Sequence, residues 1–163
     1  MKTGLYIGII VLLIPLQATI LGSISPFNLH PDLCLIAVCL IGYWVGRTQG
    51  MVMGFALGFS QDLFSAGDGW INTITKPGVG ILSAILAKNI ANSAAHSIFL
   101  PMLVFSIFSG VIFFVSARAG VGLGEILYGF RAILLPQALI DSLLAVGINW
   151  FLTRRSLDIA HAR

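Results

Sequence analysis

The sequence predicts an all-α integral membrane protein, a six-helix transmembrane bundle with both termini in the cytoplasm. Of its 163 residues, 58% are hydrophobic and 9% are charged, whereas about a quarter of the residues of soluble domains are charged. Apolar runs that approach the length of a bilayer crossing recur between short polar intervals. Glycine also recurs at every fourth position from Gly42 to Gly58, a spacing that suits close helix packing in lipid. We expect one membrane domain, residues 1–163.

The first helix is expected over residues 4–21. Lys2 precedes this apolar run, as in a secretory signal, but no small-x-small cleavage site follows before Ser23. The run therefore predicts a membrane helix, with a kink at Pro15, which lacks a backbone donor.

The second and third helices are expected over residues 32–45 and 50–64. One continuous helix over Leu33 to Phe64 would be about 48 Å long at 1.5 Å per residue, against a hydrocarbon core of about 30 Å. Two helices joined by a tight turn at residues 47–49 fit better. Both are shorter than the usual span, which predicts local bilayer thinning or shielding by neighbouring helices.

Residues 65–76 predict a loop, because they hold a Gly-Asp-Gly turn signal and Trp70, a residue typical of the membrane interface. Pro77 is then expected in the first turn of a fourth helix, residues 77–91, where a missing N–H costs least.

The fifth helix, residues 98–117, is an uncharged run of twenty residues. Residues 119–130 are rich in glycine and predict an interfacial loop or a short surface helix. The sixth helix is expected over residues 132–152.

The basic residues predict the orientation. Six spans place both termini on one side, and a cytoplasmic location for that side puts six basic residues inside and three outside, as the positive-inside tendency expects. The inside set is Lys2, Arg47, Lys88, Arg154, Arg155 and Arg163, and the outside set is Lys76, Arg118 and Arg131.

Two acidic residues are candidate functional groups. Asp141 falls near the middle of the sixth helix, where an aspartate costs about 3 kcal/mol unless it is paired or hydrated. Its polar neighbour on that helix is Gln137, so three roles stay open: a hydrogen-bonded staple between helices, a partner or ligand contact, or proton chemistry. Asp62 ends the third helix and could accept hydrogen bonds from the following loop or bind a partner.

The glycines of the third helix predict a close-packing face. Gly50, Gly54 and Gly58 lie near one side of the helix and form a groove that leads to Asp62. Another helix could approach closely along this groove. That helix could belong to the same chain or to a partner.

Several chemistries find no support in the sequence. Asp62, Glu125 and Asp141 form no paired metal motif, and no nucleophile arrangement or phosphate-binding glycine loop is present. Cys34 and Cys39 are five residues apart, on different sides of a helix, and are expected to be buried small hydrophobic residues. The basic residues form no stripe for nucleic acid. We expect no enzyme, no cofactor and no metal.

Three motifs resemble those of a known family. Pro31-Asp32-Leu33 opens an apolar helix, Arg47 lies in a basic turn, and Gly-Met-Val-Met-Gly-Phe-Ala-Leu-Gly-Phe-Ser-Gln-Asp-Leu-Phe runs over residues 50–64. This pattern, together with the length and the six apolar segments, resembles the MreD family of bacterial rod shape-determining membrane proteins.

The resemblance implies a non-enzymatic scaffold of the cell-elongation machinery, or elongasome, in the bacterial cytoplasmic (inner) membrane. The chain would cross that bilayer several times and bind MreC, a bitopic periplasmic scaffold protein. It would indirectly help couple MreB filaments to peptidoglycan synthesis by RodA and a transpeptidase, and so control cell shape. The implied fold is similar to the S-component of energy-coupling-factor transporters.

That similarity defines the alternative, a substrate-binding membrane subunit of an energy-coupling-factor vitamin transporter. A ligand cavity would then lie near the outer helix ends and use Asp62, Trp70 and Asn72. The loops show no cluster of convergent polar residues, which favours the scaffold.

Overall fold

The computed structural model describes residues 30–64, 70–89, 96–117 and 122–161, together with residues 8, 12, 13 and 15–17. Every regular element in these ranges is a helix, as predicted. The helices are α3 (Leu33–Val45), α4 (Arg47–Phe64), α5 (Ile71–Asn89), α6 (His96–Ala117), α7 (Leu123–Gly129) and α8 (Leu135–His161). The predicted first helix, residues 4–21, lies largely outside the described residues.

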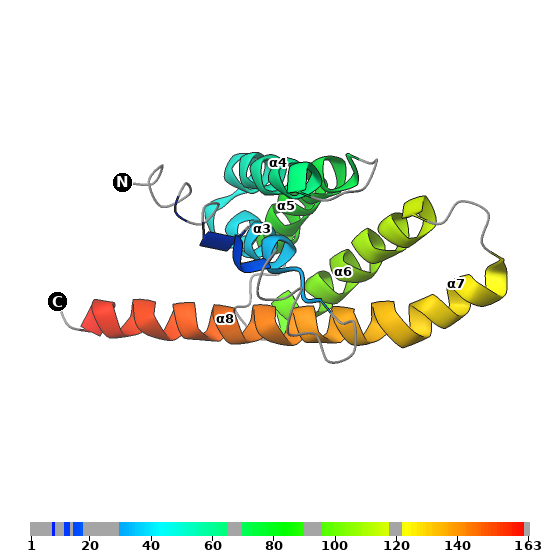
Figure 1. Ribbon diagram of the computed structural model, residues 1–163. Coiled ribbons are helices and arrows are strands. Elements are labelled where there is room, and N and C mark those ends of the chain that lie inside the picture. Colours follow the sequence, from blue (N-terminus) through cyan, green and yellow to red (C-terminus); the bar gives the residue numbers. More distant parts are fainter. Residues whose placement is uncertain are drawn as a thin grey trace.

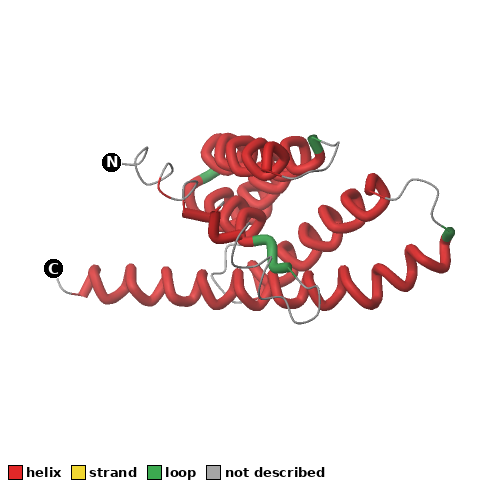
Figure 2. Tube along the Cα trace, in the orientation of Figure 1, coloured by secondary structure: helices red, strands yellow, loops and turns green. Residues whose placement is uncertain are grey.

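The helices form two groups (Figures 1 and 2). α3, α4 and α5 pack together, and the most extensive contact of the molecule is between α4 and α5. α8 runs as a long rod along one side, and α6 packs against it and diverges from it towards α7 (Figure 1). The two groups meet where α5 touches α6 and where α3 touches α8.

Two helical segments are long and apolar enough to cross a membrane, Ser97–Ser116 with 20 residues and Leu127–Arg154 with 28 residues. α3 is apolar but has only 13 residues. α4 begins with Arg-Thr-Gln and carries Gln-Asp near its end, so it is long enough but too polar to count as a candidate membrane span. The described part of the chain therefore provides two candidate spans, and the expected bundle of six spans is not supported.

The turn between α3 and α4 is tighter than predicted. Gly46 alone separates the helices, at φ +122°, and its N–H donates to the carbonyl oxygen of Ile41 at 3.4 Å. Glycine adopts this φ without a steric penalty. Residues 47–49, predicted as the turn, form the start of α4 instead.

The predicted loop over residues 65–76 is wrong from Ile71 onwards, because α5 begins there. Pro77 consequently lies inside α5 rather than in its first turn. The cause is a cap from another helix. The Asp62 carboxylate of α4 accepts the backbone N–H groups of Asn72 and Thr73, at 3.3 and 2.7 Å, which otherwise lack partners at a helix start.

For residues 119–130 the sequence predicts either an interfacial loop or a short surface helix, and residues 123–129 form the short helix α7. α7 leads into a π-helical stretch, Phe130–Leu134, and the helix continues as α8. Leu135 donates its N–H to the carbonyl oxygen of Phe130, five residues back. Pro136 follows and has no N–H to offer, so this widened turn carries the helix past the proline. The predicted start at residue 132 is therefore too late.

Glycines bring the backbones of three helices together. A methyl group at Gly50 would lie 2.6 Å from the carbonyl oxygen of Gly80 in α5 and 2.8 Å from Cα of Gly42 in α3. Further along α4, Gly54 lies against the backbone of Lys76 and Gly58 against that of Asn72. The predicted glycine face of α4 thus packs against α5 of the same chain.

Candidate functional site

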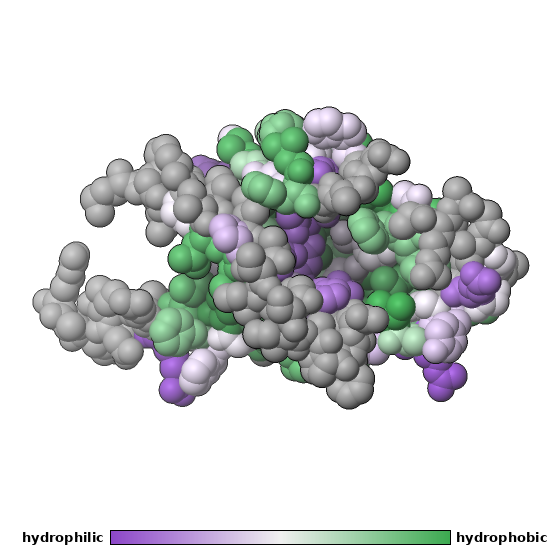
Figure 3. All heavy atoms as spheres, viewed as in Figure 1, coloured by the Kyte–Doolittle hydropathy of each residue, from purple (hydrophilic) through white to green (hydrophobic). Residues whose placement is uncertain are grey.

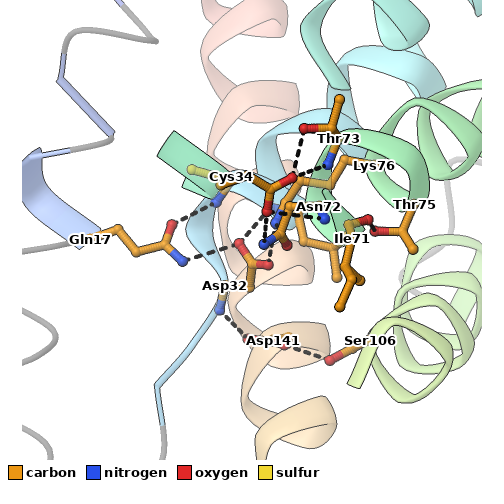
Figure 4. A network of polar contacts seen from close by, with 12 residues as sticks. Gln17, Asp32, Cys34, Ile71, Asn72, Thr73, Thr75, Lys76, Ser106 and Asp141 are labelled. Atoms are coloured by element: carbon orange, nitrogen blue, oxygen red, sulfur yellow. Dashed lines mark hydrogen bonds and ion pairs between the residues drawn. The ribbon is translucent and has the colours of Figure 1, made fainter. Parts of the chain in front are cut away.

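A buried ion pair connects α5 with the start of α3 (Figure 4). Nζ of Lys76 lies 2.7 Å from Oδ2 of Asp32 and donates to Oδ1 of Asn72 at 3.0 Å. Lys76 is 0% exposed. The second oxygen of Asp32 accepts the N–H of Leu35 at 2.9 Å, so the same carboxylate caps α3. Because a buried charge is costly without a partner, each member of the pair depends on the other.

Gln17 also forms hydrogen bonds with the start of α3. Its Nε2 donates to Oδ1 of Asp32 at 3.2 Å, and its Oε1 accepts the N–H of Cys34 at 3.2 Å. Both hydrogen bonds are made to the first turn of α3. One is to the capping carboxylate, and the other is to a backbone N–H that has no acceptor within the helix.

Asp62 is the cap of α5. Besides the two N–H groups, it accepts the side-chain N–H of Asn72 at 2.9 Å and the hydroxyl of Thr73 at 2.6 Å. Since Asn72 also receives a bond from Lys76, Asp62 and Asp32 belong to one network that spans α3, α4 and α5. This is the structural role considered for Asp62 from the sequence.

The cap predicts a measurable loss of stability. Asp62→Ala should lower the free energy of unfolding by about 1–2 kcal/mol, because the first N–H groups of α5 lose their acceptor. The measurement is the thermal unfolding midpoint of the purified chain in detergent. Asp62→Asn, which keeps one side-chain oxygen acceptor, should fall between the native chain and the alanine variant. Equal midpoints for all three proteins would contradict the capping role.

Asp141 ties α8 to α6 and to the start of α3. It is 0% exposed, its Oδ1 accepts the backbone N–H of Asp32 at 3.0 Å, and its Oδ2 accepts the hydroxyl of Ser106 at 2.6 Å. Figure 4 shows Asp141 bonded to the start of α3 on one side and to Ser106 of α6 on the other. These bonds are those that an interhelical staple requires.

A cavity of about 400 Å³ lies beside this network, between α6, α8 with the π-helical stretch before it, and the starts of α3 and α5. Figure 3 shows hydrophilic side chains gathered in the middle of the molecule, between α3–α5 and α8. The polar residues that line the cavity are Gln17, His30, Asp32, Asn72, Ser106, Ser109, Gln137 and Asp141, and its apolar residues include Phe113, Phe114, Ile133 and Leu134.

Sequence reasoning singled out Asp62, Asp141 and Gln137 but missed the role of Lys76. It placed Lys76 in an outer loop and Asp32 only in a motif, yet the structure pairs them. Asn72 precedes Lys76 by four residues, and this helical spacing is the one local signal of their contact. For a transporter subunit, the sequence predicted a ligand cavity lined by Asp62, Trp70 and Asn72. Of these three residues, Asn72 lines the observed cavity, and Asp62 and Trp70 do not.

Cys34 and Cys39 are free buried thiols in α3. Within the described ranges, no group of three or more His, Cys, Asp or Glu residues is arranged to hold a metal ion.

No protein family model, curated protein or solved structure matches the chain.

Proposed function

We propose that the chain is a non-enzymatic membrane scaffold subunit of the bacterial cell-elongation machinery. It binds an MreC-like bitopic protein in the inner membrane and supports peptidoglycan synthesis and cell-shape control. In this proposal α3, α4 and α5 lie in the bilayer beside the two candidate spans, in the N-in/C-in six-helix arrangement. The proposal rests on the likeness of Pro31–Leu33 and of residues 50–64 to the MreD family.

One structural observation supports it most. The two motif stretches are distant in the sequence, yet their acidic residues, Asp32 and Asp62, join one network through Lys76 and Asn72. The motif glycines of α4 lie directly against the backbone of α5. The two acidic residues and the glycines of the motifs therefore contribute to one packed unit of three helices, as a scaffold needs.

Since α5 occupies the glycine face, the partner helix needs another surface of this unit. A second face of α4, about 100° around the helix from the glycines, carries Phe55 and Phe59, which form an aromatic ladder with Trp70 at the start of α5. Phe55 and Phe59 stack with ring centroids 6.0 Å apart, and Phe59 and Trp70 stack at 5.7 Å. Phe55 and Trp70 are each more than half exposed. Aromatic residues are enriched where proteins meet, so the proposal assigns the MreC-like transmembrane helix to the aromatic ladder.

Site-specific photo-crosslinking tests the assignment. A photoreactive residue at Phe55 or Phe59 of the full chain in its native membrane should capture a bitopic protein with a periplasmic domain, identified by mass spectrometry. The matched control is Leu100 on α6, which is also apolar and exposed and should capture lipid. Capture of the same proteins from all three positions, or of lipid alone from all three, would contradict the assignment.

The cavity favours a second candidate, a solute-binding membrane subunit of an energy-coupling-factor transporter. Its volume of about 400 Å³ falls within the range of small-molecule sites. Copurification of the native chain with a pair of ATPases and a coupling membrane subunit would establish this candidate in place of the scaffold.

A further inference from the structure

We propose that the cavity between α6, α8 and the starts of α3 and α5 binds a small organic cation, an ammonium group that carries an apolar substituent. The inference concerns the isolated chain and holds whether or not the scaffold proposal is correct. It rests on the size of the cavity, on the presence of both polar and apolar residues in its wall, and on the balance of charge around it.

The wall of the cavity has a polar part and an apolar part. Gln17, Asn72 and Gln137 offer side-chain amides, whereas Phe113 and Phe114 offer aromatic rings. Small-molecule sites usually combine an apolar lining with a few convergent polar groups, and a volume of about 400 Å³ suits such a ligand. A ligand that fills this cavity therefore needs a polar end and an apolar end.

The charge of the wall selects a cation. Asp32 and Asp141 both line the cavity, and Lys76, 2.7 Å from Asp32, is the ammonium that the described residues place against them. The hydrogen bonds that Asp141 accepts from the described residues come from uncharged donors, the N–H of Asp32 and the hydroxyl of Ser106. Of the described residues that line the cavity, two carry carboxylates and none is a lysine or an arginine. A bound cation would balance the remaining negative charge, and an anion would add to it.

A cation in the cavity would lie close to two carboxylates, those of Asp32 and Asp141. Asp32 retains 18% of its side-chain exposure and lines the cavity, so a ligand can approach its carboxylate. Asp141 is 0% exposed and lies directly behind, bonded to the Asp32 N–H, where it acts through its charge. Phe113 and Phe114 add aromatic rings, which are favourable neighbours of ammonium groups.

Calorimetry on the purified full chain tests the proposal. The chain is placed in nanodiscs of phosphatidylglycerol, which contain no amine, and titrated with 2-phenylethylammonium or with 3-phenylpropanoate, an anion of similar shape. We expect saturable binding of the amine and at least about tenfold weaker binding of the anion, a difference of about 1.4 kcal/mol. Equal binding of both probes, or no saturable binding of the amine, would overturn the proposal.

Three variants locate the site. Asp141→Asn removes one charge but keeps an acceptor for Ser106, and it should weaken amine binding about tenfold or more. Ser109→Leu fills the cavity from α6 without touching the bonded network, and it should abolish binding while the unfolding midpoint is retained. Glu125→Gln removes an exposed carboxylate of α7 that does not line this cavity, and it should bind as the native chain does. Native-like binding by Ser109→Leu would overturn the assignment of the site, even if Asp141→Asn failed to fold.

A second pair of nanodiscs separates the sources of the ammonium group. If the natural ligand is a lipid headgroup, phosphatidylethanolamine in the nanodisc should compete with 2-phenylethylammonium. If it is a soluble amine, binding of the probe should be the same in both lipids. If the chain is a scaffold without a ligand, the MreC-like partner should copurify and no amine should bind. Copurification therefore tests the scaffold proposal, and amine binding tests the cation site independently.

Discussion

Lys76→Met is expected to destabilise the chain by about 3–5 kcal/mol, the usual cost of removing one partner from a buried ion pair. Lys76 is 0% exposed, and its ammonium group serves both Asp32 and Asn72. The methionine would fill a similar volume but leave the Asp32 carboxylate without its counter-charge. Because Asp32 also caps α3, and Asn72 bonds to the cap of α5, the loss should reach both helices.

Thermal unfolding in detergent, followed by size-exclusion chromatography, measures the effect. The matched control is Lys88→Met, which removes an exposed lysine from the last turn of the same helix and should stay within about 0.5 kcal/mol of the native chain. Adding Asp32→Asn to Lys76→Met should restore part of the stability, since the unpaired carboxylate is then removed. If both lysine variants unfold at the same temperature, the ion pair contributes nothing.

Features with a local cause could be predicted from the sequence. α6 follows from a run of twenty uncharged residues, and its described bounds differ from the predicted ones by two residues at one end. The close approach of helices at Gly50, Gly54 and Gly58 follows from their spacing. Asp141 was singled out because a carboxylate inside an apolar helix is costly without partners.

Features that depend on contacts between distant residues could not be predicted. The start of α5 is set by Asp62, which belongs to the preceding helix, whereas the local rule for Pro77 pointed to a start that is six residues too late. The continuity of α7 and α8 depends on the π-helical stretch before Pro136. The position and the lining of the cavity could not be predicted, because its wall joins residues as far apart in the sequence as Gln17 and Asp141.

Gly54→Ala is the second change for which we expect a large effect. The added methyl group would lie 2.6 Å from both the carbonyl carbon and the carbonyl oxygen of Lys76, and these are backbone atoms that cannot rotate away. α4 and α5 must separate to make room, at a cost of about 1–3 kcal/mol, as for other overpacked sites. Gly54→Leu should cost more. Both changes also disturb Lys76, the residue that the ion pair requires.

Gly78→Ala is the matched control, because it adds the same methyl group within α5 at a position with nothing within 4 Å. It should leave the unfolding midpoint unchanged or raise it, since alanine favours a helix by up to about 1 kcal/mol over glycine. Partner capture distinguishes the two roles considered for the glycine face. If the face only packs against α5, capture should fall in proportion to the folded fraction of Gly54→Ala. A variant that keeps its native midpoint and still loses the partner would show that the partner, and not α5, needs Gly54.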